Sequence, residues 1–429
     1  MTGSSRQRCI GLFAFSLWVL VFTGCGGGNS SIAGPTPTPT PQPSASSVSV
    51  TFTDGTPTAV AVKIGSGAFT ATSVQNGQTS FLLPAGTTSY ALAYVCPPEG
   101  PPAIITTNEI VIEATLADGA SYSTSCVDQP PTANATGTVD ATAIPGASNV
   151  VIFGKNGFAN TISAASGSFN ATLPSGTNDV AAVAKDASGN VLAVKILRSQ
   201  TVPGAVNGGN SIVFSAADEI TLETATIGNA PAGFIPPELF VQYRTGNGTQ
   251  INLELSTAGT YQVIPATAAQ AGDSYFVDCS TEDTVTGNSV VGVNQVFSSA
   301  TPLTINLPAV WSNATAPPAA AFPTFALNYT GFTAGSNLAF QGDIAWATSN
   351  TTFNHVLVTA TSSFQNGSTT LSVPNLASLP GFFTPAASGT TIGWNVIIVN
   401  AQQSLTLLPS LEGNGIGPLV ESRGTYVVP

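Results

Sequence analysis

Short segments in which apolar and polar residues alternate recur along most of this chain. Residues 47–53 and 109–115 alternate in this way, and an Asp-Gly pair follows each of them, at Asp54 and at Asp118. A period of two places one set of side chains on each face of a strand, and Asp-Gly favours the turn that ends it. Residues 149–153 are apolar throughout, which indicates a more fully buried strand. These patterns predict an all-β fold.

The composition favours the same fold class. Only 7% of the residues are charged, whereas about a quarter are charged in an average soluble protein. Thr, Ser, Asn and Gln supply the polarity instead. Thr, Val, Ile, Phe and Tyr favour strands, and the helix formers Lys, Glu, Arg and Met are scarce.

The N-terminal residues have the order of an export signal. Arg6 and Arg8 precede the apolar residues 9–22, and two small residues then precede Cys25. The run Phe22-Thr23-Gly24-Cys25 resembles the lipobox of bacterial lipoproteins, in which cleavage leaves a cysteine that carries acyl chains. The resemblance predicts a signal peptide over 1–24 and lipidation of Cys25. A plain secretory signal followed by an unrelated cysteine is the alternative.

Residues 25–45 are predicted to be a tether. Gly and Ser follow Cys25 and form a flexible coil, and the Pro-Thr repeats at 35–41 form an extended spacer. Several acyl chains on one residue give stable membrane anchoring. We therefore expect an exported protein on a bacterial membrane, with the outer membrane or the cell surface as its location.

Three proline-rich breaks, near 127–135, 229–237 and 316–323, divide the remaining chain. We predict four tandem β-sandwich modules of the Ig-like or transthyretin-like kind. An internal echo supports repeated modules, because the pattern at 80–87 recurs at 168–177 and, more faintly, at 259–265. The predicted ranges are 46–129 for module 1, 130–222 for module 2, 223–314 for module 3 and 315–429 for module 4.

Module 2 has a recognisable pattern. Gly137-Thr138-Val139, Pro145-Gly146-Ala147, the strand at 149–153, and Ser168-Phe169 with the turn at 173–177 resemble the carboxypeptidase-regulatory-like (transthyretin-like) sandwich family. The resemblance covers most of module 2 and, less well, module 1. It implies a seven-stranded accessory module without catalytic residues of its own.

The cysteines of the body predict one disulfide. Cys96 and Cys126 each end an alternating segment of module 1, at 90–96 and 121–126, so both are expected at the same end of one sandwich. An oxidising compartment favours a disulfide between them, and two separately buried thiols are the alternative. Cys279 remains, and we expect a buried thiol rather than a nucleophile because no base lies near it in the sequence.

The chain offers little catalytic chemistry. His355 is its only histidine, so zinc sites and two-histidine iron sites lack their ligands, and no Gly-x-Ser-x-Gly motif occurs. We expect a structural or surface role for His355 on a strand. We assign no catalytic residue, metal ligand or cofactor and predict a protein that is not an enzyme. Two carboxylates that meet in space leave a hydrolase as an alternative.

Two further residue sets were candidates for binding. Asp273, Asp278, Glu282 and Asp283 surround Cys279 and predict a solvated loop, with calcium binding as the alternative. Aromatic side chains can form sugar-binding platforms. Core packing is favoured for the three tryptophans of the body, Trp311, Trp346 and Trp394, and Trp311, beside a proline-rich joint, is expected to be the most exposed of them.

The charge balance limits the partners. The net charge is −12, so nucleic acid and polybasic membrane binding are excluded. The sequence predicts a cell-envelope lipoprotein with a non-catalytic binding, adhesion or structural role. A polysaccharide-binding lipoprotein of an uptake or degradation system is the alternative. If the modules follow one another away from the membrane, modules 3 and 4 lie farthest out, and the unknown protein or polysaccharide ligand is expected there.

Overall fold

The computed structural model describes residues 45–52, 55–98, 105–124, 126, 131–256, 259–298, 301–332, 337–401 and 417–429. The predicted signal peptide, Cys25 and most of the tether lie outside these ranges. Within them the regular structure is almost entirely β-strand, so the all-β prediction is confirmed. No helix in the described part is long and apolar enough to cross a membrane.

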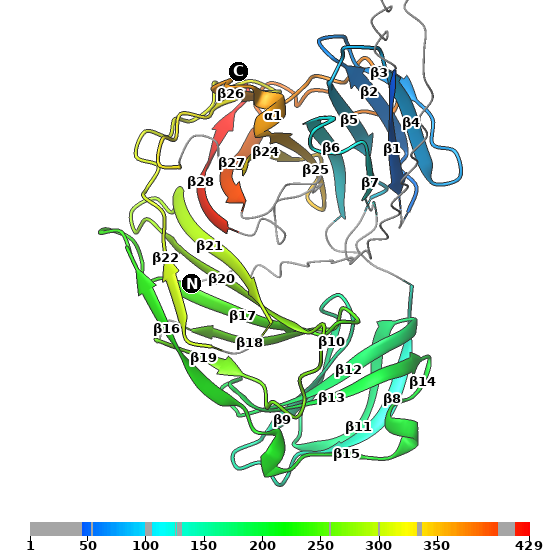
Figure 1. Cartoon of the computed structure of the whole chain (residues 1–429), viewed down its shortest axis with the longest axis vertical. Coiled ribbons are helices and arrows are strands. Elements are labelled where there is room, and N and C mark those ends of the chain that lie inside the picture. The colour runs from blue at the N-terminus through cyan, green and yellow to red at the C-terminus, as the bar shows by residue number, and fades with distance from the viewer. Residues whose placement is uncertain are drawn as a thin grey trace, which may run out of the picture.

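Module 1 is a sandwich of two layers (Figure 1). The layer β4-β1-β7 packs on the layer β3-β2-β5-β6, and Val48 and Val50 of the first contact Tyr90 and Leu92 of the second in one buried cluster. The strands are β1 (Ser46–Phe52), β2 (Ala59–Ile64), β3 (Thr70–Thr72), β4 (Gln78–Leu83), β5 (Ser89–Val95), β6 (Ile105–Thr115) and β7 (Ser121–Thr124).

Module 2 has its own buried cluster, between the layers β11-β8-β14 and β10-β9-β12-β13. The ring of Phe169 lies over Gly137, where any Cβ would clash with it. Its elements are β8 (Thr132–Asp140), β9 (Asn149–Phe153), β10 (Ala159–Ile162), β11 (Ser166–Pro174), β12 (Gly176–Lys185), β13 (Val191–Val202), β14 (Gly204–Ala205), β15 (Ile212–Val213), and the 3-10 helices η1 (Val206–Gly209) and η2 (Ala216–Asp218).

Module 3 contains the layers β19-β16-β22 and β18-β17-β20-β21. Its first strand begins two residues before the predicted boundary at 223. The strands are β16 (Thr221–Gly228), β17 (Glu238–Arg244), β18 (Gln250–Ser256), β19 (Thr260–Val263), β20 (Ser274–Glu282), β21 (Ser289–Phe297) and β22 (Leu303–Asn306).

Module 4 has a smaller second layer, β23-β26, over the strands β25-β24-β27-β28. Long segments without regular structure also cover it, and they supply Leu376 and Phe382 to the core. Its elements are β23 (Thr324–Ala326), β24 (Asn337–Ala347), β25 (Thr352–Thr361), α1 (Ser362–Gln365), β26 (Thr370–Ser372), β27 (Thr391–Ala401) and β28 (Gly417–Val427).

The modules share one strand order. In modules 1 to 3 the first strand lies between the fourth strand and the seventh, which runs parallel to it, and the third, second, fifth and sixth strands form the other layer. Module 4 repeats this order for its six described strands. The three echoed segments of the sequence all fall on or beside the fourth strand, namely β4, β11 and β19. The echo therefore marks equivalent positions.

Three modules are joined through one 12-stranded sheet. The sixth strand of module 3, β21, pairs antiparallel with the sixth strand of module 4, β28. At the other end of module 4, β25 pairs parallel with β6 of module 1. Module 4 thus lies between modules 3 and 1, and these modules are not separate beads on a string.

The second layers lie on opposite sides of this shared sheet. In modules 3 and 4 the second layer covers the side that carries Val277, Val293, Val396 and Val358. In module 1 the layer β4-β1-β7 covers the other side, which carries Leu92 and Ile112. The inner side of module 4 therefore continues as the outer side of module 1.

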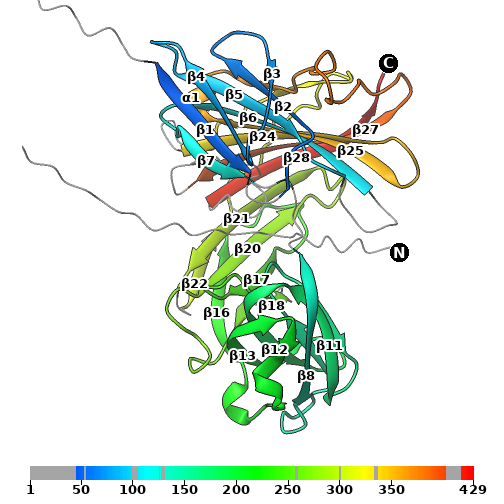
Figure 2. The same cartoon turned by 90° about the vertical axis from the view of Figure 1, so that its right-hand side faces the viewer.

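The expectation that modules 3 and 4 lie farthest from the N-terminus is corrected by this arrangement. Figure 2 shows the first segments of the chain, in blue, beside the last segments, in orange and red, while the middle of the chain forms the other half of the molecule in green. The pairing of β25 with β6 is the cause. Module 4 lies against module 1, and modules 2 and 3 extend away from both.

Candidate functional site

One side of the shared sheet carries polar side chains across modules 3 and 4. This arrangement results from the alternation of side chains along each strand. In β24, Phe340, Ile344 and Trp346 point into the core. Gln341 and Asp343 point to the other side of the sheet. The register then aligns neighbours into rows, such as Asp343 beside Asn395 and Asn395 beside Arg423. We call this side of the sheet the polar face. Its buried members are Gln242, Arg244, Asn294, Gln341, Thr359 and Glu421. Its half-buried members are Asp278, Glu282, Asp343, His355, Asn395 and Arg423.

Arg423 connects the two modules on the polar face. Its Nη2 donates to Glu282 on β20, its Nη1 lies 3.6 Å from Oε1 of Glu421 on its own strand, and its Nε donates to the carbonyl of Gly287 at 2.8 Å. The guanidinium therefore balances two carboxylates and fixes the turn that follows β20. This contact holds β28 of module 4 against module 3.

His355 lies where modules 4 and 1 meet. It is on β25, in accordance with the predicted strand. Its Nδ1 is 3.2 Å from Oδ1 of Asn108 on β6, and its Nε2 is 3.7 Å from Oδ1 of Asp343 on β24. The imidazole is half-buried, so it contributes both to the joint and to the polar face.

The acidic residues around Cys279 do not form a loop. Asp278, Cys279 and Glu282 are on strand β20, because Tyr275, Val277 and Cys279 alternate with polar residues and pack into the core. Asp278 and Glu282 therefore point to the polar face and Cys279 to the opposite side. The predicted solvated loop is therefore wrong for Asp278 and Glu282. Asp283 begins the turn after β20, where its carboxylate accepts hydrogen bonds from the backbone N–H groups of Thr286 and Ser289. Among the described residues no group of three His, Cys, Asp or Glu side chains is placed to hold a metal ion.

Asp273, just before β20, instead belongs to a junction between modules 2 and 3. Nη2 of Arg198 donates to Asp273 at 2.6 Å, and Nη1 donates to Asp179 at 3.0 Å. Tyr243 donates its hydroxyl to Asp273 at 2.5 Å, and Asn247 donates its side-chain amide to Asp179 at 2.9 Å. We call these five residues the Arg198 junction.

The two carboxylates of the Arg198 junction are stabilised as anions. Burial alone would raise the pKa of Asp273, but hydrogen bonds from Arg198 and Tyr243 outweigh it and hold that pKa below its ordinary value. Burial likewise opposes the ionisation of Asp179, and donors that include Asn247 and the backbone N–H of Ser199 lower its pKa overall. This network is a structural clamp, because its polar groups satisfy one another.

The tryptophans do not form a sugar-binding platform. Trp346 and Trp394 are buried, as predicted. The expectation that Trp311 is the most exposed of the three is wrong, since only 3% of it is exposed. Its Nε1 donates to Oδ1 of Asn328 at 2.8 Å, and Tyr329 packs edge-on against its ring. Trp311 therefore belongs to the buried core of modules 3 and 4.

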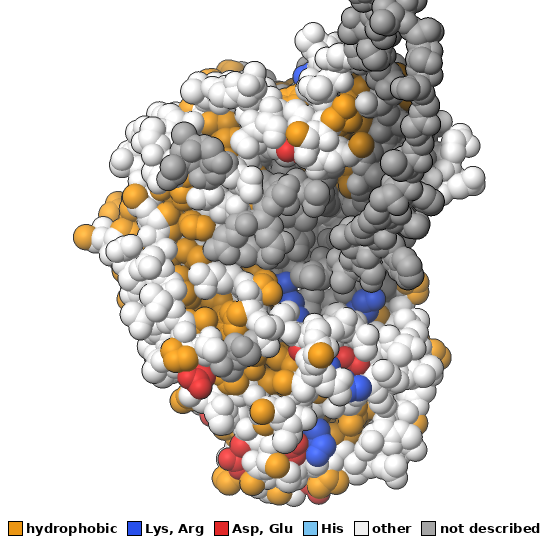
Figure 3. Space-filling model, viewed as in Figure 1, with side chains coloured by type: hydrophobic (Ala, Val, Ile, Leu, Met, Phe, Trp, Pro, Cys, Tyr) orange, Lys and Arg blue, Asp and Glu red, His pale blue; other side chains and the backbone are white. Residues whose placement is uncertain are grey.

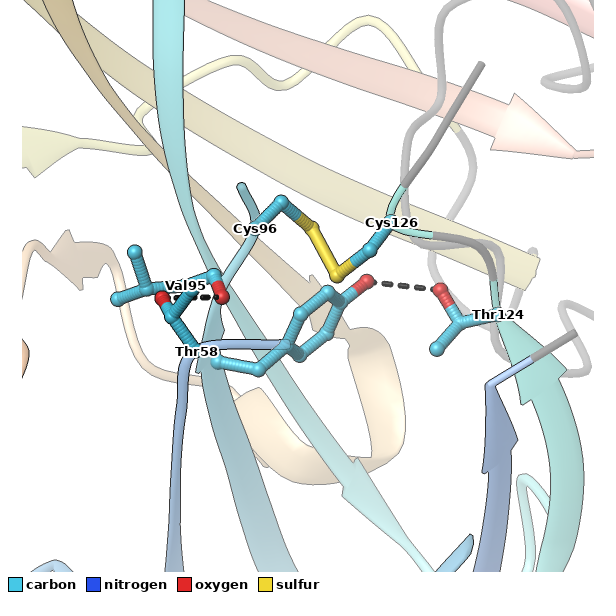
Figure 4. Close-up of a disulfide and its surroundings, with 6 residues drawn as sticks. Thr58, Val95, Cys96, Thr124 and Cys126 are labelled. Atoms are coloured by element: carbon cyan, nitrogen blue, oxygen red, sulfur yellow. Dashed lines mark hydrogen bonds between the residues drawn. A yellow bond between two sulfur atoms is a disulfide. The ribbon is translucent and has the colours of Figure 1, made fainter. Parts of the chain in front are cut away.

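The predicted disulfide between Cys96 and Cys126 is present (Figure 4). It joins the end of β5 to the residue beyond β7 and so connects the two layers of module 1. Beside it, the hydroxyls of Tyr94 and Thr124 lie 2.7 Å apart. Cys279 is a buried thiol, and burial raises its pKa to about 12, which suppresses the reactive thiolate.

Two buried carboxyls were missed by the sequence reasoning. Glu109 and Glu113 lie on β6, on the side that faces the segments of module 4. Burial raises the pKa of each to about 7, although a hydrogen bond from the backbone N–H of Phe383 partly opposes the effect at Glu109, and Lys63 partly opposes it at Glu113. Two acids four positions apart, separated by the apolar run Ile110-Val111-Ile112, were the available signal.

Arg244 was also missed. It is the last residue of β17, with only 5% of its surface exposed. A basic residue at the end of the predominantly apolar segment 239–244, in a chain with nine basic residues, was the signal in the sequence.

Comparison with known proteins adds little. No family model matches the chain, and no characterised sequence is similar to it. A solved structure titled "The Bacillus anthracis TIE protein" aligns with 10% identity over 61% of this chain and 50% of that one, with a TM-score of 0.15. The chain thus spans about half of that structure.

Proposed function

We propose that this chain is an exported cell-envelope lipoprotein, anchored through Cys25, with a non-catalytic binding, adhesion or structural role. The lipobox-like run and the tether support the anchor. The Cys96–Cys126 disulfide supports an oxidising compartment, where such bonds persist. The carboxypeptidase-regulatory-like resemblance of module 2 supports an accessory rather than a catalytic role.

The polar face supports binding. Its side chains extend from strands of modules 3 and 4 that belong to one hydrogen-bonded sheet, so their spacing is fixed before any ligand arrives. Preorganised polar groups bind with a smaller entropic cost than groups on mobile loops. We therefore assign the ligand to the polar face rather than to the loops of module 4.

A polysaccharide is the second candidate among the ligands. Amide and hydroxyl groups stand in neighbouring rows of the polar face: the half-buried Asn395 is the most accessible, and Gln341 and Thr359 are buried beside it. Such groups match the hydroxyls of sugars. The face of the molecule drawn in Figure 3 is mostly uncharged, with small separate spots of acidic and basic side chains.

The test uses protein that begins at residue 26. Binding to a glycan array and to isolated cell-envelope fractions is measured for the unaltered protein and for Asn395→Ala and Arg423→Gln. Matched controls are Asn134→Ala and Lys195→Gln, both in module 2 and away from the polar face. We expect the polar-face variants to lose binding at least several-fold while the controls retain it. Equal loss in both sets, or turnover of a bound glycan, would contradict the proposal.

A further inference from the structure

Arg244 has an unusual environment for a cation. Its two Nη atoms are buried and have no hydrogen-bond partner in the described part of the chain. Its Nε donates to Oε1 of Gln242 at 2.6 Å. A buried polar group without a partner is costly, and in native proteins such groups are nearly always satisfied by protein, water or ligand.

The guanidinium is nevertheless held in place. Its central carbon lies 4.1 Å from the centroid of the Phe276 ring, which comes from the neighbouring strand β20. Stacking on an aromatic ring fixes the plane of the group, and the bond to Gln242 fixes its rotation in that plane. The two outer nitrogens remain as a prepared pair of donors.

The other two arginines of the described part differ from Arg244. Arg198 pairs with Asp179 and Asp273, and Arg423 with Glu282 and Glu421. For Arg244 the dominant influence is burial, which lowers its pKa to about 10, and among the described residues it forms no ion pair like those of Arg198 and Arg423. The partner that the guanidinium of Arg244 lacks is therefore an anion.

The site borders the surface. Asn252 on β18 is exposed and accepts a hydrogen bond from Nε2 of Gln242 at 3.0 Å. On the other side of Phe276, Val296 of β21 is 41% exposed. The half-buried Asp278, two residues beyond Phe276 on β20, lies on the same side of that strand as Phe276.

We propose that Arg244 is the recognition group for an oxyanion, a carboxylate or phosphate of the ligand, bound through its two Nη donors. A planar guanidinium matches two oxygens of either group with parallel hydrogen bonds. This inference rests on the proposed function, because it assigns the ligand's charged group to the module 3 end of the polar face. A ligand with neutral sugars and spaced acidic groups would fit Arg244 together with the amide rows of module 4.

The test measures the binding of small anions directly. Isothermal titration calorimetry and thermal unfolding are carried out on protein that begins at residue 26. The added compounds are glucuronate, inorganic phosphate and, as the neutral counterpart, glucose. The variant is Arg244→Met, which keeps the stem and the packing on Phe276, and Lys195→Met is the control cation. Without anion, we expect Arg244→Met to unfold at the same or a higher temperature, since it removes an unpaired buried charge.

With anion, the unaltered protein and Lys195→Met should be stabilised, and Arg244→Met should lose about tenfold or more in affinity. A response to glucuronate alone identifies a carboxylate ligand, and a response to phosphate alone identifies a phosphate ligand. Equal responses of Arg244→Met and the unaltered protein, or an equal response to glucose, would overturn the inference. A glycan that binds both proteins equally would keep the proposed function and remove this assignment.

Discussion

Nδ1 of His355 lies 3.2 Å from Oδ1 of Asn108, although 247 positions separate the two residues in the chain. The contact belongs to the parallel pairing of β25 with β6, which extends over nine residue pairs. The first and last modules therefore share one sheet, in which β25 is the partner of the outermost strand of module 1 and β6 is the partner of the outermost strand of module 4.

Removal of module 4 should consequently damage the rest of the protein. A chain that ends at residue 314 leaves β6 and β21 with unpaired edges and uncovers much of the shared core, and such edges promote aggregation. We expect this truncated chain to be insoluble or to elute as aggregates in size-exclusion chromatography. Separately expressed 315–429, added during refolding, should restore a soluble complex. A monodisperse, cooperatively unfolding truncation product would contradict the shared sheet.

The Arg198 junction should contribute measurably to stability. Arg198→Ala leaves Asp179 and Asp273 buried without their cation, which costs about 2 to 4 kcal/mol once partial exposure of the arginine is taken into account. The matched control is Lys195→Ala, which removes a more exposed pair with Asp218 and should cost about 0 to 1 kcal/mol. Urea unfolding followed by fluorescence compares the two. Similar costs for both variants would argue against a clamp.

The junction should also weaken in acid. The pKa values of Asp179 and Asp273 are lowered in the folded protein, so the stabilisation they give is complete above their unfolded pKa of about 4. It is lost as the pH falls through the folded values. Unfolding temperatures measured between pH 2 and pH 5 should therefore drop more steeply for the unaltered protein than for Arg198→Ala.

Glu109 should make the free energy of unfolding depend on pH in the opposite direction. Its pKa rises from 4.5 to about 7 on folding, so the folded protein retains a proton that the unfolded chain has lost. The free energy of unfolding should therefore decrease between about pH 4.5 and 7 and level off above pH 7, with a contribution on the order of 3 kcal/mol. Glu109→Gln should flatten this part of the profile, and Glu219→Gln, at an exposed site, should leave it unchanged. An unaltered slope in Glu109→Gln would refute the burial effect.

The thiols of protein that begins at residue 26 provide a further test. We expect no reaction of the folded protein with a thiol reagent at pH 8, because Cys279 is buried with a raised pKa. Denaturation should release one thiol, and reduction should release three. Loss of the disulfide opens a connection of 30 residues and should cost about 2 to 4 kcal/mol. Three thiols before reduction would exclude the disulfide.

Anchoring is tested by Cys25→Ala. If the cysteine carries the acyl chains, this variant should move from the membrane to the soluble fraction after cell disruption. A high-salt wash separates lipid anchoring from weak ionic adsorption. Retention of the washed variant on membranes would contradict the lipoprotein proposal.

Local patterns predicted the strands well and their distant partners poorly. The apolar run at 149–153 became β9 without change, and the alternation before Asp118 became the end of β6. The pairing of β6 with β25 has no local signal, because hydrogen-bond partners far apart in the sequence are selected by packing of the whole chain. This pairing is also what made the expected order of modules wrong.

The candidate site shows the same limit. Alternation could place Asp343 and Phe340 on opposite sides of β24. Only the register between β24 and β27 places Asp343 beside Asn395. Trp311 was expected to be the most exposed of the three tryptophans because it lies beside a proline-rich segment, yet Asn328 accepts a hydrogen bond from its indole N–H inside the fold. Arg244 was missed because an unpaired buried charge can be recognised only after its neighbours are known.

The parallel seam between β25 and β6 also has a mechanical meaning. For a protein tethered at its N-terminus and bound to a ligand on modules 3 and 4, tension would pass from module 1 to module 4 through this seam. A pull along the strand axis loads the interstrand hydrogen bonds side by side, so they must break together rather than one after another. Modules 1 and 4 would then resist being pulled apart, because all the hydrogen bonds between β25 and β6 would have to break at once.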